Sequence, residues 1–401
     1  MNLEEIYATL GILAAIVFLY TLVAKKVEDT IISGPMIYVA LGLVLGAPGL
    51  GLIGTDASSA DLRLLADITL ALILFSDAAH ANLSVVRKQA LYPTRMLALG
   101  LPGAIAIGFA VGYLLFDEFS VIEAAILATM LAATDAALGK AVITNPSVPT
   151  AVREGLNVES GLNDGLCVPI LLILITMASS GQEHVTTSHA LVLVGEEIGI
   201  GLAVGLSFAF IGAKLLIWSA NKQWLSEVWG QLTVAAIALA SFGLAQALHG
   251  SGYIAAFSGG MLFGHLLSSH THKLVLTTES IAELFAMLTW VLFGAAVVAL
   301  LLDYLSLSIF IYAALSLTLV RILPIYLSFL GTSVSSGQRL FMGWFGPRGL
   351  ASLVFAIIVL DAGVANAELI AVVVSTTVIF SLIAHGISAK PLASKLGAKQ
   401  Q

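Results

Sequence analysis

Residues 159–165 read ESGLNDG, and residues 133–140, one apolar segment earlier, read ATDAALGK. Both stretches interrupt long apolar runs with carboxylates, hydroxyls or an amide. An ionisable side chain at the depth of a lipid bilayer is costly, and such residues usually mark the path of an ion or a proton. Asp135, Glu159 and Asp164 therefore indicate a membrane protein with a buried site for a hard cation or for protons.

The composition points to a polytopic α-helical membrane protein. Of the 401 residues, 59% are hydrophobic and 10% are charged, whereas soluble domains carry about 25% charged residues. The net charge of −7 and the lack of a basic patch argue against a nucleic-acid partner. Cys167 is the single cysteine, which excludes an internal disulfide and a thiolate metal cluster. Glu4 and Glu5, rather than lysines, precede the first apolar run, so we expect a retained helix and not a signal peptide.

Apolar stretches separated by charged or Gly/Pro-rich breaks predict an all-α protein with about thirteen transmembrane helices. The predicted spans are residues 5–24, 31–47, 61–80, 95–116, 121–143, 152–178, 189–218, 229–248, 253–268, 279–302, 306–330, 339–360 and 366–387. Basic residues gather in the connections on one side and after the last span, and acidic residues gather on the other side. This positive-inside pattern predicts a multi-pass protein of the cell (inner) membrane, with the N-terminus outside and the C-terminus in the cytoplasm.

Two of the predicted spans contain signals for a break in the helix. Residues 346–349 read GPRG in the twelfth span, where the proline removes a backbone donor and the glycines add flexibility. In the fifth span, Thr134 and Asp135 are followed by Gly139. Broken helices at corresponding places in two halves are typical of transporters built from inverted repeats. A simple kink at Pro347 is the alternative.

Charges inside the spans predict ion pairs. Arg321 and Arg348 lie within the eleventh and twelfth spans and need counter-charges, for which the acids of the fifth and sixth spans are the candidates. At about 100° per residue, Ser160 and Asp164 share one stripe of a helix, and Glu159 shares the next stripe with Asn163. We expect the first stripe to face an aqueous ion cavity and Glu159 to be held by an arginine.

These motifs resemble the NhaP-type branch of the cation–proton antiporters, which are relatives of the animal and fungal sodium/hydrogen exchangers. The resemblance rests on Thr134-Asp135, on the ESGLNDG stretch, on Arg321 and on residues 346–349, where the family often has a GLRG-like sequence. It covers essentially the whole chain. Pro347 is a departure from that pattern.

The resemblance implies a fold and an assembly. The fold is an inverted repeat with two broken, crossing helices in the fifth and twelfth spans, and the assembly is a homodimer in the membrane lipid. A dimerisation domain would comprise residues 1–94 and 221–302, and a core transport domain residues 95–178 and 303–388. Residues 179–220 would form a linker helix, and residues 389–401 a short cytoplasmic tail.

The resemblance also implies roles for individual residues. Asp164 matches the essential proton- and cation-binding aspartate, and the transported ion would also be bound by Asp135, Thr134 and Ser160. Glu159 and Arg321 match a salt bridge of the core with Asn163 beside it, and Arg348 matches the basic residue at the unwound twelfth span. Because relatives with Asn before this aspartate tend to be electroneutral, the resemblance implies exchange of one cation for one proton. Asp77 is a further candidate, for attracting cations at the entrance.

We therefore expect a secondary active antiporter that exchanges Na⁺, and also Li⁺, for H⁺ by alternating access, with cation and proton competing for Asp164. No cofactor and no enzymatic activity are predicted. A K⁺/H⁺ antiporter of the same architecture remains an alternative, and so does an ion-coupled transporter of organic anions.

Two further classes fit the sequence less well. A cation channel would need repeated filter loops or rings of charge, and an intramembrane hydrolase using Ser160 or Asp164 would need an accompanying base. The sequence shows neither pattern. It assigns no role to Glu283 or to the predicted loop histidines His270 and His272.

Overall fold

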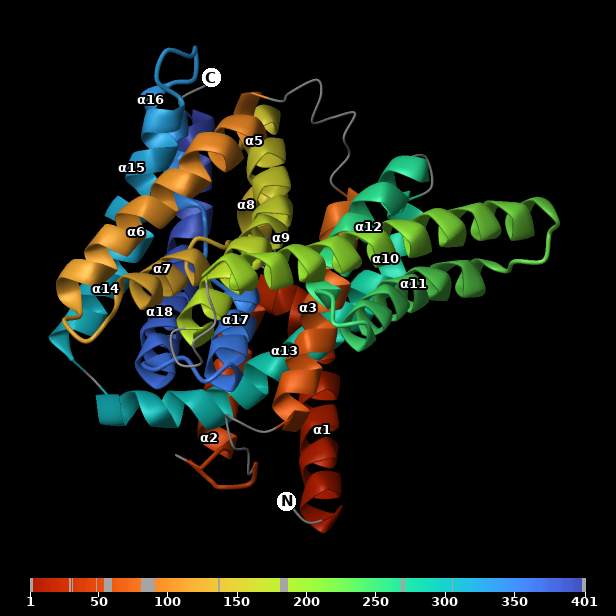
Figure 1. The fold of residues 1–401 in the computed structure, drawn as a ribbon, viewed down its shortest axis with the longest axis horizontal. Helices are drawn as coiled ribbons and strands as arrows, with labels where there is room; N and C mark the ends of the chain where they lie inside the picture. Colours follow the sequence, from red (N-terminus) through yellow and green to blue (C-terminus); the bar gives the residue numbers. More distant parts are fainter. Residues whose placement is uncertain are drawn as a thin grey trace. The chain divides into compact units, whose positions relative to one another are not determined.

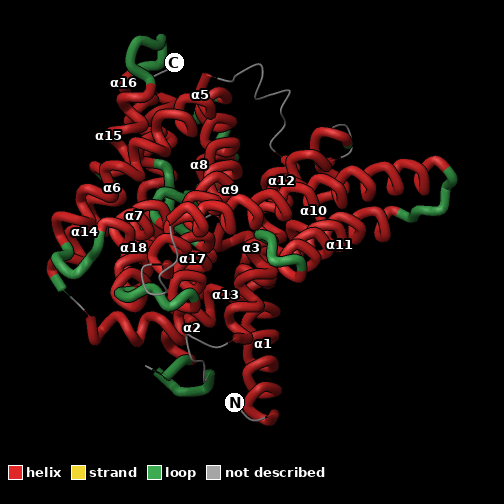
Figure 2. The backbone as a smooth tube through the Cα atoms, in the orientation of Figure 1, coloured by secondary structure: helices red, strands yellow, loops and turns green. Residues whose placement is uncertain are grey.

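The described part of the chain is helical throughout. The computed structural model describes residues 3–28, 30, 32–47, 49–53, 60–80, 91–135, 138–180, 187–267, 271–304 and 306–398. Within these ranges every regular element is a helix, and loops join the helices (Figure 1, Figure 2). This is the all-α class that the apolar runs predicted.

Each predicted span coincides with one helix or with consecutive helices. In chain order these are α1 (Leu3–Glu28), α2 (Gly34–Leu45), α3 (Ala60–His80), the continuous α5 (Leu91–Arg95), η1 (Met96–Gly100) and α6 (Leu101–Leu115), α7 (Val121–Met130) with α8 (Lys140–Ile143), α9 (Thr150–Ser180), α10 (Thr187–Asn221), α11 (Glu227–Ala247), α12 (Gly252–Leu266), α13 (Thr271–Tyr304), α14 (Leu307–Leu317) with α15 (Leu319–Ser328), α16 (Ser336–Trp344) with α17 (Leu350–Asp361), and α18 (Ala367–Ala398). Eight helical segments of the described chain are long and apolar enough to cross a membrane, and three shorter apolar helices accompany them. The chain is thus a multi-pass membrane protein, and the count of thirteen crossings stays a prediction.

Two helices are longer than the apolar runs that predicted them. Helix α13 begins at Thr271, so His272 lies in a helix and its prediction as a loop residue was wrong. Lys273, the next residue, forms an ion pair of 2.8 Å with Glu227 of α11. Helix α18 continues to Ala398, well beyond the predicted end of its span at residue 387. Both extensions are amphipathic in composition, so a search for apolar runs stops short of them. His270 lies outside the described residues.

The chain divides into two compact units. The first comprises residues 1–66, 91–160 and 286–401, and the second comprises residues 67–90 and 161–285. The division into transport and dimerisation domains remains a prediction.

Small residues bring the helices of the first unit close together. Gly108 of α6 faces Ala128 of α7 and Val320 of α15, where an added Cβ would lie 3.3 Å from both side chains. Helix α18 packs against α14 and α17. Its buried residues include a long apolar face, and polar side chains such as Ser381 and His385 are buried with it.

Two non-helical segments meet in the first unit. Helix α7 ends at Met130, and residues 133–135 are not helical, while residues 345–349 run without helical structure between α16 and α17. The backbone N–H of Asp135 donates to the carbonyl oxygen of Pro347 at 2.8 Å. The segments that the sequence marked as breaks therefore lie against one another and satisfy part of each other's backbone hydrogen bonding.

Glycines also set the packing of the second unit. Helices α10, α11 and α12 pack against one another (Figure 1). On α12, a Cβ at Gly260 or Gly264 would overlap the backbone of Phe75 or Ala79 in α3, so only glycine allows this approach of the two helices. Between these helices, the Tyr253 hydroxyl donates to the buried Asp67 carboxylate at 2.5 Å.

Candidate functional site

Thr134 and Ser160 form a buried pair of hydroxyls in the first unit. The Ser160 hydroxyl, on α9, donates to the Thr134 carbonyl oxygen at 3.0 Å, and the two hydroxyl oxygens are also 3.0 Å apart. The side chains are 2% and 8% exposed. The structure therefore brings together two of the oxygen donors that the sequence singled out, one from the interrupted segment and one from the helix after it.

The Asp135 carboxylate receives hydrogen bonds from two backbone amides. Leu138 N donates to Oδ1 at 3.1 Å, and Leu350 N, at the first residue of α17, donates to Oδ2 at 3.0 Å. A negative charge at the N-terminus of a helix is stabilised by the helix dipole and by the amides that have no partner within the helix. Gly349 makes this contact possible, because a Cβ there would overlap the Asp135 carboxylate.

Arg348 makes the opposite contact at the end of α7. Its side chain is completely buried, and Nη1 donates to the carbonyl oxygens of Ala132 and Ala133, each at 3.3 Å. Ser352 adds a hydrogen bond of 2.8 Å from its hydroxyl to the Met130 carbonyl oxygen. A cation near a C-terminal helix end is favourable for the same reason that an anion is favourable at an N-terminal end. The two breaks thus carry complementary charges, a carboxylate at the start of α17 and a guanidinium just beyond α7.

Glu159 and Arg321 form a buried bidentate ion pair. Nη1 lies 2.7 Å from Oε1 and Nη2 lies 2.9 Å from Oε2, and both side chains are 1% exposed. The predicted salt bridge is therefore present. Gly346 lies over the guanidinium, where a Cβ would be 2.7 Å from Arg321 Cζ. The ion pair consequently supports the non-helical segment before α17.

The second half of the ESGLNDG motif lies in the second unit. Helix α9 is continuous from Thr150 to Ser180, so Asp164 follows Ser160 by one helical turn on the same stripe, as predicted. Asn163 is 0% exposed and Asp164 is 6% exposed. The predicted partition of this helix into two polar stripes is thus compatible with the helix that forms.

The glycines of this motif determine what packs beside it. A Cβ at Gly161 would touch Asp77 of α3 at 3.4 Å, and a Cβ at Gly165 would overlap the ring of Phe257 in α12. Asp77 is half-buried at this helix contact. The structure does not test its proposed role at an entrance.

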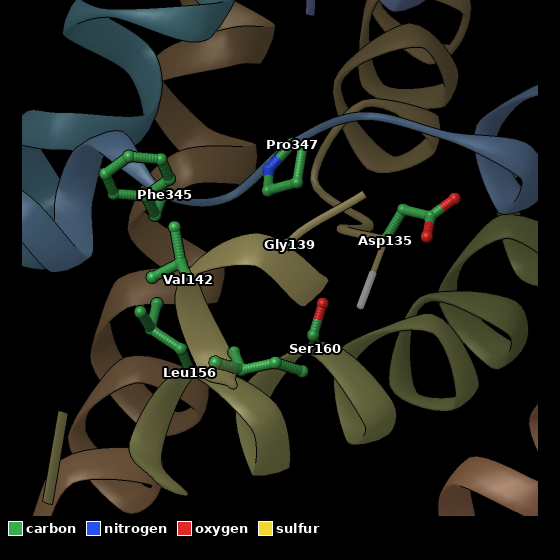
Figure 3. Close-up of a pocket in the computed structure, with 8 residues that line it drawn as sticks. Asp135, Gly139, Val142, Leu156, Ser160, Phe345 and Pro347 are labelled. Atoms are coloured by element: carbon green, nitrogen blue, oxygen red, sulfur yellow. The ribbon is translucent and has the colours of Figure 1, made fainter. Parts of the chain in front are cut away.

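A small pocket in the first unit reaches the interrupted segments. Figure 3 shows the polar residues Asp135 and Ser160 on one side of it and the apolar side chains of Val142, Leu156 and Phe345 on the other. Pro347, on the extended segment, completes the lining between them. Among the described residues, no group of three or more His, Cys, Asp or Glu side chains could hold a metal ion.

Sequence reasoning missed the polar side chains of α18. Ser381 is fully buried and accepts a hydrogen bond from the backbone N–H of Arg348 at 2.7 Å, and His385 is 3% exposed and contacts the Trp344 carbonyl oxygen at 2.8 Å. Ser388 accepts from the indole nitrogen of Trp344 at 2.8 Å. The spacing of these three residues, at i, i+4 and i+7 in an apolar helix, is a signal that could have found them. The side chain of Lys140, which follows the first break, lies outside the described residues.

Comparisons with known proteins show which family the chain matches. The model of the family described as sodium/hydrogen exchanger, transmembrane, matches residues 12–395. The K(+)/H(+) antiporter NhaP2 of Shewanella sp. (strain ANA-3) is 26% identical over 387 residues, which is 94% of this chain and 64% of the relative. The Na(+)/H(+) antiporter NhaH of Halobacillus dabanensis is 28% identical over 310 residues, or 73% of each chain. Thus the chain spans less than two thirds of the length of the first of these relatives.

A solved structure has the same fold. The sodium proton antiporter MjNhaP1 from Methanocaldococcus jannaschii at pH 8 superposes with a TM-score of 0.79 and 22% identity, covering 98% of this chain and 99% of that one. The chain therefore shares the fold of that protein.

Proposed function

Since the chain belongs to the sodium/hydrogen exchanger family, we propose that it is a secondary active antiporter that exchanges a monovalent alkali cation for protons. The observation that carries the proposal is the pair of interrupted segments in the first unit. Asp135 caps the start of α17 and Arg348 binds the carbonyl groups beyond α7. Broken helices whose ends meet within an apolar protein are typical of transporters built from inverted repeats. We assign α7 with α8 and α16 with α17 to the two broken, crossing helices.

The exchange step uses competition for one carboxylate. Asp164 holds either a proton or a cation, because binding both leaves the site with an unfavourable positive charge. Thr134, Ser160 and Asp135 supply further oxygens for the cation, and Asn163 keeps the neighbouring position uncharged. A neutral site crosses the low-dielectric barrier during alternating access, whereas an empty and negatively charged site is held back. The barrier to an empty site suppresses transport of cations or protons without exchange.

The charge arrangement supports a stoichiometry of one cation for one proton. Glu159 is paired with Arg321 and is thereby withdrawn from exchange. Arg348 donates to carbonyl oxygens beyond α7, and Asp135 accepts from two backbone amides while it also offers an oxygen to the cation. One exchanging carboxylate on Asp164 then carries one charge in each direction, so we propose electroneutral exchange.

Oxygen ligands favour a hard alkali cation over a transition metal. We propose Na⁺, with Li⁺ as a second substrate, and K⁺ is the alternative of the same mechanism. One relative is named a K(+)/H(+) antiporter and another a Na(+)/H(+) antiporter, so the names of the relatives support both ions. We further propose a homodimer in the cell membrane, with the N-terminus outside and with the transport and dimerisation domains divided as the sequence predicts.

The test is proton flux in everted membrane vesicles from an antiporter-deficient strain, energised to an acid interior and followed with a dye that reports the pH gradient. Dequenching on addition of Na⁺ or Li⁺, absent with Asp164→Asn, supports the sodium proposal. Dequenching with K⁺ alone would identify K⁺ as the substrate and would leave the proposed mechanism unchanged. No response to any alkali cation between about pH 5 and 9, a range that brackets general-base titration, overturns cation/proton exchange and favours the organic-anion transporter.

A further inference from the structure

The end of α16 lacks a hydrogen bond that a continuous helix would contain. In an α-helix the carbonyl oxygen of Trp344 would accept from the N–H of Arg348, four residues later. Instead, Phe345 has φ −81° and ψ 72°, the values of an inverse γ-turn, and Gly346 N donates to the Trp344 carbonyl oxygen at 2.9 Å. The chain then turns away, and the N–H of Arg348 needs another acceptor.

Two side chains of α18 connect the separated groups. Arg348 N donates to Ser381 Oγ at 2.7 Å, Ser381 Oγ lies 3.1 Å from His385 Nδ1, and His385 Nε2 lies 2.8 Å from the Trp344 carbonyl oxygen. His385 Nδ1 also lies 2.9 Å from the Ser381 carbonyl oxygen. All four groups belong to the first unit. A path of three polar contacts therefore runs from the Arg348 amide to the Trp344 carbonyl.

The contacts fix the direction of one hydrogen bond of this path, because the Arg348 amide donates and Ser381 Oγ accepts. His385 Nε2 faces the Trp344 carbonyl oxygen, and Nδ1 faces both the hydroxyl and the carbonyl oxygen of Ser381. A carbonyl oxygen only accepts, so a neutral imidazole donates to one of these two carbonyl oxygens at a time. With the proton on Nε2, the imidazole donates to Trp344 and joins the end of α16 to α18.

We propose that Ser381 and His385 are a positioning pair that replaces the missing helical hydrogen bond and holds the break between α16 and α17 in place. This inference rests on the proposed antiport function, because the segment that the pair holds carries Arg348, which that function uses. The pair meets the Arg348 amide and the Trp344 carbonyl oxygen. It acts through Arg348, whose guanidinium binds the carbonyl groups of Ala132 and Ala133.

The neighbouring residues leave few other ways to fix this segment. Pro347 has no N–H to contribute, and its ring opposes a return to helix. The Pro347 carbonyl accepts from Asp135 N, so a displacement of the segment moves the other break as well. Trp344 is anchored from the same face of α18 by Ser388, and its ring lies 5.1 Å from that of His385.

The test uses His385→Phe and Ser381→Ala, which remove parts of the path, and His385→Gln, whose amide offers one donor and one acceptor. Thr377→Val is the matched control, because Thr377 is also buried on α18 but its hydroxyl bonds only to Val373 O of its own helix at 2.7 Å. The first measurement is hydrogen exchange of the peptide containing residues 345–350 in the purified full chain. We expect exchange to be at least fivefold faster in Ser381→Ala and His385→Phe and within twofold of the wild type in the other two variants.

The second measurement is cation-dependent proton flux in vesicles, with the half-saturating cation concentration and the maximal rate determined separately. The half-saturating concentration should rise at least fivefold in His385→Phe and return to within twofold in His385→Gln. Hydrogen exchange in His385→Phe and Ser381→Ala that equals that of Thr377→Val overturns the positioning role. Wild-type protein without flux overturns the proposed function, while hydrogen exchange still decides whether the pair fixes the break. If His385→Phe does not fold, Ser381→Ala gives the same decision.

Discussion

Removing one partner of the Glu159–Arg321 pair should destabilise the protein strongly. Both side chains are 1% exposed and are joined by hydrogen bonds of 2.7 and 2.9 Å. Arg321→Met keeps much of the side-chain volume and leaves the Glu159 carboxylate buried without its guanidinium. Breaking a buried pair in this way costs about 3–5 kcal/mol. At about 2–4 °C per kcal/mol, as in domains of moderate size, the midpoint of thermal unfolding should fall by roughly 6–20 °C.

A double-variant cycle separates the charge from the packing. Glu159→Gln should lower the free energy of unfolding as much as Arg321→Met, because it leaves the guanidinium buried. The double variant removes both charges, and neutral replacement of a buried pair costs little, so it should recover to within about 2 kcal/mol of the wild type. The assay is thermal unfolding of the purified protein in detergent, followed by intrinsic tryptophan fluorescence.

The exposed ion pair between Arg63 and Asp361 is the matched control in the same unit. Its side chains are 32% and 61% exposed, and an exposed pair contributes about 0–1 kcal/mol. Arg63→Met should therefore lower the midpoint by less than about 4 °C. The reasoning is refuted if Arg321→Met unfolds at the same temperature as Arg63→Met, or if the double variant is as unstable as the sum of the two single variants.

Three further outcomes follow from the site. Asp164→Asn should abolish cation-dependent proton flux while the unfolding midpoint stays within a few degrees of the wild type, since the side chain is nearly isosteric; flux at the wild-type rate would show that another group exchanges the proton. Gly349→Ala should lower the free energy of unfolding by about 1–3 kcal/mol and remove most of the flux, because its Cβ overlaps the Asp135 carboxylate. The control Gly337→Ala, in helix α16 with open space around it, should leave the free energy of unfolding unchanged or raise it by up to ~1 kcal/mol. Equal behaviour of the two variants in unfolding and flux would argue against the capping role. With Asn163 in place, exchange should be electroneutral, so its rate in proteoliposomes should not change when a K⁺ gradient and valinomycin set the membrane potential. A rate that follows the membrane potential would contradict one-for-one exchange.

The sequence predicted the helices well and their ends less well. Long apolar runs report burial in lipid or protein, and each predicted span overlaps a helix of the structure. The extended ends of α13 and α18 escaped because polar residues such as Lys273 continue a helix without continuing an apolar run. Periodicity also placed Ser160 and Asp164 on one stripe correctly, because α9 has no interruption between them.

Some partners of the buried charges were predicted from the sequence, and others were found only in the structure. The pairing of Glu159 with Arg321 followed from the cost of an isolated charge, which leaves few alternatives in an apolar chain. Asp135 was predicted as a carboxylate of the proton and cation exchange site, and the structure shows that it also accepts a hydrogen bond at the start of α17. The pair Ser381 and His385 drew no prediction, because two polar residues in a long helix do not reveal which distant backbone groups they meet.

The amino-acid sequence by itself determined that this is a helical membrane protein with charges held at depth, because hydrophobicity and the cost of burying charge depend on residue type and order. The tertiary structure decided how the two interrupted segments complete each other. Asp135 reaches the amide of Leu350, and Arg348 reaches carbonyl groups more than two hundred positions earlier in the chain. Those contacts depend on which helix ends meet after packing, and residue order alone does not specify that meeting.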